Sequence, residues 1–217
     1  DNSLKECISQ SNKNNWQIVQ DVAWQDYKLV PTLTMAGYSI MMKEISEQIN
    51  DCQISHVILQ AGVGGMAAAM VAGITRYLKN VPKIIIVEPE NAGCVFESIK
   101  HGRIEKISIK SESLMGGMSC DEVSLIPWKI LKNSVNYCVT VSDKYISKIV
   151  KSLANSELSD EKIVGGECST PGIISLYGLC EDYKIKKEIN LNENSNVLLI
   201  GCEGDADENL YQKLLNS

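Results

Sequence analysis

The stretch that decides the fold runs from His56 to Ile74 and reads HVILQAGVGGMAAAMVAGI. It opens as a short apolar run typical of a strand, passes through Gly62, Gly64 and Gly65, and continues as an alanine-rich run typical of a helix. A second apolar run follows at Lys83–Pro89. Strand, glycine turn, helix and strand form a βαβ unit, which predicts a parallel sheet.

The glycine turn has two interpretations. Glycines let the backbone approach a ligand closely, and the first N–H groups of a helix, at the positive end of its dipole, favour an anion such as phosphate. We therefore expect backbone N–H groups of Gly62, Val63, Gly64, Gly65 and Met66 to bind a phosphate group. The alternative is that these glycines serve only a tight turn between strand and helix.

Composition and charge narrow the class of protein. The chain has 217 residues, 44% of them hydrophobic, which is enough to bury the core of one large domain. A net charge of −6 argues against a nucleic-acid partner. No apolar run has the length of a membrane span and no signal peptide is visible, so we expect neither a membrane partner nor secretion, and a cytoplasmic location.

The eight cysteines are scattered, without a Cys-x-x-Cys pair, and only His56 and His101 could add imidazole ligands. We therefore expect no metal site. Free, buried cysteines in a reducing cytoplasm are the better interpretation.

Periodicity and turn residues predict the remaining elements. Helices are expected at 3–13, 35–50, 92–100, 126–133 and 144–154, then from the turn at 165–172 to about 184, and at the end of the chain. Strands are expected at 16–20, 137–141 and 196–200, and a loop at 24–34. Asp21 follows the first of these strands, at the end where side chains of α/β proteins commonly meet ligands. Ser142 is a suitable N-cap for the helix after it.

Four glycine-bearing turns follow or flank the predicted strands, at 62–65, 116–117, 165–166 and 201–204. Parallel strands place such turns on one edge of a sheet. We therefore expect the four turns to converge on a single ligand.

A dinucleotide is the first candidate for that ligand. Gly62 to Ala67 resembles the pattern G-x-G-x-x-G/A, and Glu88 ends the next strand, where an acid that binds ribose would lie. Against it, Pro89 follows Glu88 directly, and the other glycine turns would have no role. A non-catalytic α/β module that binds a small anion, a nucleotide or a partner chain remains the alternative to an enzyme.

A second candidate comes from a resemblance. Val87-Glu88-Pro89 after a glycine phosphate loop is typical of the fold type II enzymes that use pyridoxal phosphate (PLP), the tryptophan synthase β group. Several motifs more specifically resemble the diaminopropionate ammonia-lyase family, in order along essentially the whole chain: VQDVAW at 19–24, PT at 31–32, GY at 37–38, LQAGVG at 59–64 and EGD at 203–205. The resemblance implies PLP as cofactor and α,β-elimination of 2,3-diaminopropionate to pyruvate and two ammonia.

The resemblance also implies a three-layer α/β fold with a parallel sheet, of the tryptophan synthase β type. Residues 1–34 would be the remainder of a small domain and the crossover, and residues 35–217 the large domain that binds the PLP phosphate. It further implies a small amino-acid substrate and a homodimer.

Individual residues take roles from the same resemblance. Asp21 would transfer the Cα proton, and Cys202 would meet the pyridine nitrogen, where most relatives carry Ser or Thr. Glu167 and the turn at 116–117, with Gly116, would line the cofactor pocket. The alternatives are that Asp21 caps a helix or turn, that Cys202 is a small buried apolar filler, and that Gly116 and Glu167 reflect ordinary turn chemistry.

One expected part is missing. PLP enzymes hold the cofactor covalently through a lysine, which in this family comes early in the polypeptide. The earliest lysines here, Lys5, Lys13 and Lys28, lie in polar contexts typical of solvated side chains. Because the chain also begins at Asp1, we expect it to be a C-terminal part, incomplete at its N-terminus. We expect it to be inactive alone, and to self-associate or to bind the missing half.

Overall fold

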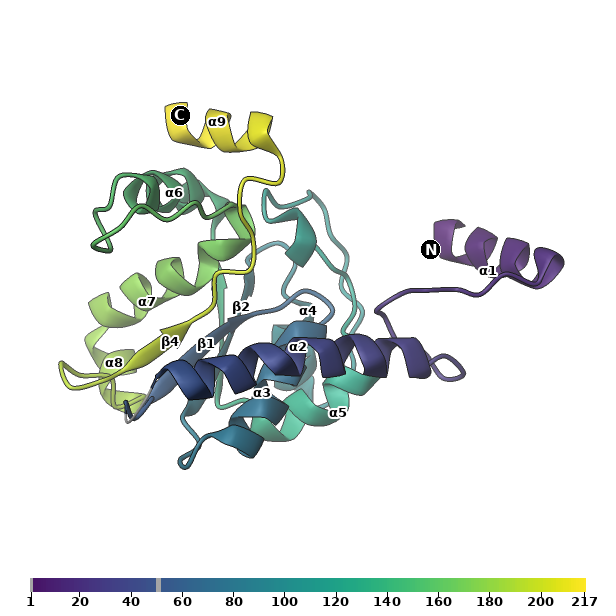
Figure 1. Cartoon of the computed structure of the whole chain (residues 1–217), viewed down its shortest axis with the longest axis horizontal. Coiled ribbons are helices and arrows are strands. Elements are labelled where there is room, and N and C mark those ends of the chain that lie inside the picture. The colour runs from purple at the N-terminus through teal and green to yellow at the C-terminus, as the bar shows by residue number, and fades with distance from the viewer. Residues whose placement is uncertain (1, 50–51) are drawn as a thin grey trace.

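The computed structural model describes residues 2–49 and 52–217 (Figure 1). Four parallel strands form its sheet in the order β3-β2-β1-β4: β1 (His56–Gln60), β2 (Lys83–Pro89), β3 (Tyr137–Val141) and β4 (Val197–Leu199). Helix α3 (Gly65–Tyr77) connects β1 to β2, so the predicted βαβ unit is confirmed.

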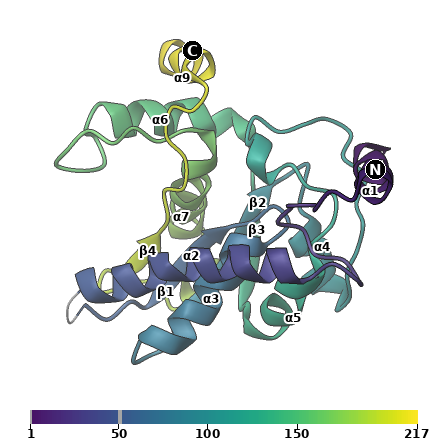
Figure 2. The same ribbon diagram turned by 45° about the vertical axis from the view of Figure 1, so that its right-hand side comes forward.

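Helices cover both faces of this sheet (Figures 1 and 2). Val57 and Leu59 of β1 pack with α3, with α2 (Leu29–Gln48) and with α5 (Leu125–Ser134), whereas Ile58 points to the opposite core. That second core contains α6 (Ile146–Ala154), α7 (Pro171–Glu181) and α9 (Glu208–Asn216). This alternation along a strand buried on both faces gives the expected three layers. The remaining helices are α1 (Asn2–Asn14), α4 (Cys94–His101), α8 (Tyr183–Glu188) and the short 3₁₀ helices η1 (Gly116–Met118), η2 (Asp143–Tyr145) and η3 (Glu167–Ser169).

The N-terminal region differs from its prediction. Both views place α1 away from the sheet (Figures 1 and 2). The expected strand at 16–20 is wrong: this segment joins no sheet, and its backbone contacts the hydroxyl of Tyr27 through Ile18 and Gln20 instead. The loop expected at 24–34 is wrong from Leu29 onward, because α2 begins there with Pro31 in its first turn, where an N–H has no helical partner. The expected helix end at Asn50 lies outside the described residues, and the division at 34/35 stays a prediction.

Two helix boundaries also differ. The helix expected to reach about 184 breaks at Asp182, whose Oδ1 accepts hydrogen bonds from the N–H groups of Lys184 and Ile185 and so starts α8. Ser142 occupies the N-cap position of η2, directly before α6, as expected. Its side chain makes no capping hydrogen bond, and its hydroxyl donates to Glu90 Oε1 at 2.8 Å instead.

Among the described residues, no helix is long and apolar enough to cross a membrane, and no cluster of three or more His, Cys, Asp and Glu side chains suits a metal ion. The eight cysteines are free, and Cys94 and Cys168 are buried. Four others are exposed, so the expectation of buried cysteines is wrong for Cys7, Cys52, Cys180 and Cys202.

Candidate functional site

A cleft of about 280 Å³ opens beyond the carboxyl ends of β1 and β4. Its lining comes from several separate segments: Asp21, Tyr38, Gln60, Ala61, Gly62, Val63, Gly64, Gly65, Met66, Ala67, Gly117, Met118, Cys168, Cys202 and Glu203. Three of the four predicted turns supply lining residues, and the fourth is attached because the Gly166 N–H donates to the Glu203 carbonyl at 3.0 Å. Three of the expected turns therefore meet at one cleft and the fourth adjoins it. Their convergence on a single ligand stays a prediction.

The three glycines of the first turn have different reasons to be glycine. A Cβ on Gly62 would lie 2.9 Å from the Gly117 carbonyl oxygen, and Gly64 has a φ of +89° that disfavours other residues. A Cβ on Gly65 would meet no protein atom within 4 Å. The tight-turn interpretation therefore accounts for Gly62 and Gly64, and leaves open space in front of Gly65.

The same turn presents hydrogen-bond donors. Gly64 is the N-cap of α3 and no side chain caps this helix. The Ala68 N–H donates to the Gly64 carbonyl at 2.9 Å, and the N–H groups of Gly65, Met66 and Ala67 precede the first intrahelical bond. These groups and the positive end of the helix dipole favour an anion in the cleft.

Asp21 reaches the cleft from the segment before α2. Within residues 2–49 and 52–217, its carboxylate makes no hydrogen bond or ion pair, and the N-cap of α2 is Lys28, so the capping interpretation of Asp21 is wrong. Two contacts hold the backbone on either side: the Gln20 N–H donates to Tyr27 Oη at 2.9 Å and the Ala23 N–H donates to Ser124 Oγ at 2.8 Å. Asp21 is thus an accessible carboxylate on a fixed backbone.

Cys202 lies on the floor of the cleft beside Gln60, whose Nε2 donates to Cys202 Sγ at 3.1 Å. The Cys202 thiol contacts the Cys168 carbonyl oxygen at 3.6 Å. Although residue 202 as a whole is exposed, desolvation of its sulfur raises the pKa of the thiol, against the opposing hydrogen bond from Gln60. Cys202 is therefore a polar contact in the cleft, and the apolar-filler interpretation is wrong.

Glu88 has no access to the cleft. It is fully buried, and its carboxylate accepts the N–H groups of Val95 at 2.9 Å and Phe96 at 2.7 Å, at the start of α4. Burial raises its pKa to about 7 against those hydrogen bonds. The ribose-binding role that a dinucleotide site would require of Glu88 is therefore wrong.

Two predicted pocket turns reach the cleft through one residue each. In the predicted turn 116–117 the residue that lines the cleft is Gly117 and not Gly116, and in the other turn Cys168 lines it in place of the predicted Glu167. Both pairs begin 3₁₀ helices, η1 and η3, whose tighter winding was not read from the sequence. Sequence reasoning also missed Tyr38, Gln60 and Glu203 as lining residues, although each is within or next to a motif already quoted.

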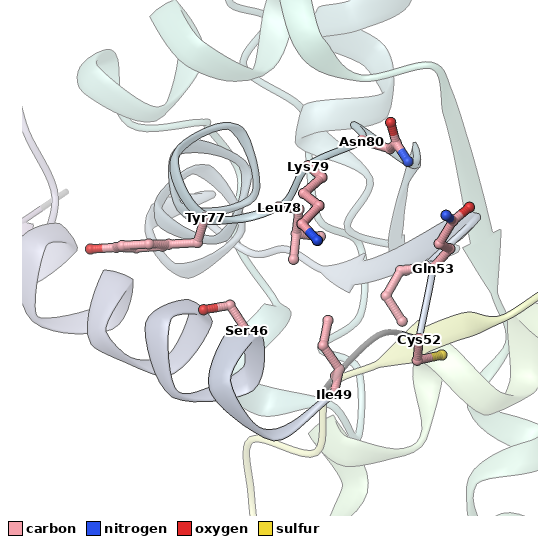
Figure 3. Close-up of a pocket in the computed structure, with 9 residues that line it drawn as sticks. Ser46, Ile49, Cys52, Gln53, Tyr77, Leu78, Lys79 and Asn80 are labelled. Atoms are coloured by element: carbon pink, nitrogen blue, oxygen red, sulfur yellow. The ribbon is translucent and has the colours of Figure 1, made fainter.

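A second hollow, of about 230 Å³, lies at the opposite edge of the sheet (Figure 3). We call it the amino-edge pocket, since Gln53 and Ile54 precede β1 and the segment 77–80 precedes β2. Ser46 and Ile49, at the end of α2, lie opposite Leu78 and Lys79 in Figure 3. No predicted site residue lines this pocket.

Comparisons with known proteins agree with this geometry. The family model of pyridoxal-phosphate dependent enzymes matches residues 5–203. Diaminopropionate ammonia-lyase of Escherichia coli K12 is 30% identical over 99% of this chain, and the chain spans 56% of that relative's length. The solved holo structure of the Escherichia coli enzyme superposes with a TM-score of 0.88 at 29% identity, covering 99% of this chain and 55% of that one. A threonine deaminase from Solanum lycopersicum, 20% identical with a TM-score of 0.77 over 96% of this chain and 55% of its own, shares the fold. With its matched glycine turn at the carboxyl edge of a parallel sheet, this chain belongs to the family of pyridoxal-phosphate dependent enzymes.

Proposed function

We propose that the cleft holds the phosphate of PLP against the loop Gly62–Met66. The residues fit this group: Gly65 leaves a space that a Cβ would fill, and the N–H groups of Gly65, Met66 and Ala67 have no acceptor among the described residues. The neutral thiol of Cys202 lies at the other side of the same cleft, within reach of a heterocycle whose phosphate occupies the loop. Gly116 would support the site through its neighbour Gly117.

We propose further that the whole enzyme eliminates ammonia from 2,3-diaminopropionate, giving pyruvate and two ammonia. The observation that carries this proposal is that a phosphate loop, Cys202 and an unpaired carboxylate share one cleft. Support also comes from the similarity to ammonia-lyases of that specificity along 99% of the chain. Bound PLP supplies an electron sink for the electrons released at the substrate Cα.

Asp21 is the residue that we propose for proton transfer. Its carboxylate lines the cleft without a hydrogen bond or ion pair among the described residues, so it is free to accept a proton from a substrate bound there. The hydrogen bonds of Tyr27 and Ser124 to the neighbouring backbone fix the position of this base.

A lysine that holds the cofactor has to come from elsewhere. No lysine lies among the described residues that line the cleft. The chain spans about half the length of the curated diaminopropionate ammonia-lyases that it matches. We propose that a lysine-bearing segment, matching the other part of the relatives, completes the site, and that the complete protein is a cytoplasmic homodimer.

The experiment that tests this function compares two preparations. The 217-residue chain alone and the chain co-expressed with the polypeptide encoded upstream of Asp1 are each given PLP and 2,3-diaminopropionate, and pyruvate is measured. We expect pyruvate from the second preparation only. Pyruvate from the first, with a borohydride-reducible PLP adduct on one of its own lysines, would contradict the proposal. Bound PLP without pyruvate from either would favour the non-catalytic binding module.

A further inference from the structure

Gln60 occupies a central position that the proposed function does not explain. It is the last residue of β1, directly before the phosphate loop, and only 3% of it is exposed. Its Nε2 contacts three acceptors: the Ile200 carbonyl at 2.7 Å, the Cys168 carbonyl at 3.1 Å and Cys202 Sγ at 3.1 Å. One side-chain amide therefore connects β1, η3 and the segment after β4 at the floor of the cleft.

The orientation of this amide is fixed by its surroundings. The carbonyl oxygens of Ile200 and Cys168 only accept hydrogen bonds, so the nitrogen of Gln60 has to face them. The other branch, Oε1, is buried and has no partner among the described residues. Because a buried acceptor without a partner is costly, the contacts of Nε2 have to outweigh that cost, and they hold the amide in this one orientation.

The same amide determines what Cys202 offers to a ligand. Nε2 has two hydrogens for its three acceptors, so its hydrogen bond to Cys202 Sγ shares a hydrogen with one of the carbonyl oxygens, and this contact holds the sulfur in place. The thiol keeps its proton, and its contact with the Cys168 carbonyl, at 3.6 Å, is long enough to be exchanged for a better acceptor. An unprotonated nitrogen of an aromatic ring is such an acceptor.

We propose that Gln60 is a positioning residue for the ring-nitrogen contact: it holds Cys202 so that the thiol donates to the ring nitrogen of a phosphate-bearing heterocycle in the cleft. This inference rests on the proposed function, because it requires a PLP-like ligand with its phosphate on the loop. It goes further in naming the residue that sets the thiol's direction, and in tying that role to an uncharged ring nitrogen.

The test uses pyridoxine 5′-phosphate, which lacks the aldehyde and so forms no adduct with surface lysines. Its affinity is measured by titration calorimetry for the wild type, Gln60→Met, Cys202→Ala and the double variant. We expect each single change to weaken binding about 3- to 10-fold, the value of one hydrogen bond, and the double variant to bind no worse than the weaker single one. The 1-deaza analogue, which has carbon in place of the ring nitrogen, should bind all four proteins within about 2-fold.

Gln53→Met is the matched control, because this exposed glutamine lines the amino-edge pocket, and it should bind like the wild type. The inference would be overturned if the double variant lost affinity by the product of the two single losses. It would also be overturned if the deaza analogue lost as much affinity as pyridoxine 5′-phosphate does.

Should Gln60→Met fail to fold, the side-chain amide resonances of Gln60 in the ¹⁵N-labelled wild type give the answer. We expect pyridoxine 5′-phosphate to shift them and inorganic phosphate not to; equal shifts overturn the role of Gln60. A wild type that binds no pyridoxine 5′-phosphate refutes the proposed function itself.

Discussion

The cleft and the amino-edge pocket lie at opposite edges of one sheet and have similar volumes, about 280 and 230 Å³. Helix α3 contributes to both, its first residues to the cleft and its last, Tyr77, to the pocket. The cleft therefore receives free N–H groups and the positive end of the dipole, whereas the pocket lies at the C-terminal ends of α2 and α3, where carbonyl groups disfavour an anion.

This difference leads us to expect that the direction of one helix, more than the size of a hollow, selects the cleft for the proposed phosphate. Glycine supports that choice. The cleft has Gly62, Gly64 and Gly65 at the helix start, which would let the backbone contact a ligand, whereas the amino-edge pocket is lined by longer side chains such as Tyr77 and Lys79.

Among the variants that test this difference between the two hollows, Gly65→Asp should change ligand affinity the most. The new side chain has open space and lies at the first position of α3, where a carboxylate favours the helix dipole, so the fold should persist. Its charge would occupy the phosphate position, and the affinity for pyridoxine 5′-phosphate should fall by about 100-fold or more. Calorimetry measures the affinity and a thermal melt the stability.

Asn80→Asp is its matched control, since it adds the same charge to the amino-edge pocket. The affinity for pyridoxine 5′-phosphate should be unchanged. Equal losses in the two variants would mean that net charge, and not the cleft, governs binding.

Asp21→Asn tests the chemistry of the cleft in the complete enzyme. The amide keeps the size of the side chain and removes the base, so kcat for at least one enantiomer of diaminopropionate should fall about 100-fold, while PLP is retained. Asp26→Asn, at an exposed turn position that does not line the cleft, should be fully active. Full activity of Asp21→Asn with both enantiomers would remove Asp21 from the mechanism.

The buried carboxyl group of Glu88 should make the stability of the fold depend on pH. Its pKa is about 7 in the folded protein against 4.5 for an ordinary glutamate, so between these values only the folded state keeps the proton. The free energy of unfolding should therefore fall by up to about 3 kcal/mol as the pH rises from 4.5 to 7, and this loss should level off above. Urea unfolding at pH 5 and pH 8 measures it. A Glu88→Gln variant that keeps the wild-type slope would contradict this assignment.

Gly73→Ala should have the smallest effect, and on stability alone. Gly73 lies in the middle of α3, and a Cβ there would come 2.5 Å from Met42 Cβ of α2. We expect a loss of about 1–3 kcal/mol in the free energy of unfolding, with unchanged affinity for pyridoxine 5′-phosphate. Gly178→Ala, in an open position of α7, should instead gain up to about 1 kcal/mol. A changed affinity for pyridoxine 5′-phosphate in Gly73→Ala would show that the packing of α2 on α3 influences ligand binding in the cleft.

Much of the fold could be predicted because its signals are local. The apolar runs of β1 and β2 and the glycines between them specify strand, turn and helix without distant contacts. The phosphate loop and Cys202 could be placed on one edge because parallel strands put their carboxyl ends together. Their assignment as cofactor contacts stays a prediction until a ligand is bound.

The rest depends on contacts that the sequence does not display. Alternation at 16–20 indicates a strand, but pairing needs a neighbouring edge, and the hydroxyl of Tyr27 takes the backbone groups of this segment instead. Gln60 could not be identified as a floor residue, because its partners Cys168 and Ile200 lie more than a hundred residues away.

A crystal structure of the 217-residue chain with pyridoxine 5′-phosphate tests the central claim most directly. The account predicts the phosphate within hydrogen-bond distance of the backbone N–H groups of Gly65 and Met66, and the ring nitrogen within hydrogen-bond distance of Cys202 Sγ. A phosphate bound instead in the amino-edge pocket, beside Tyr77 and Lys79, with the cleft unchanged, would contradict it.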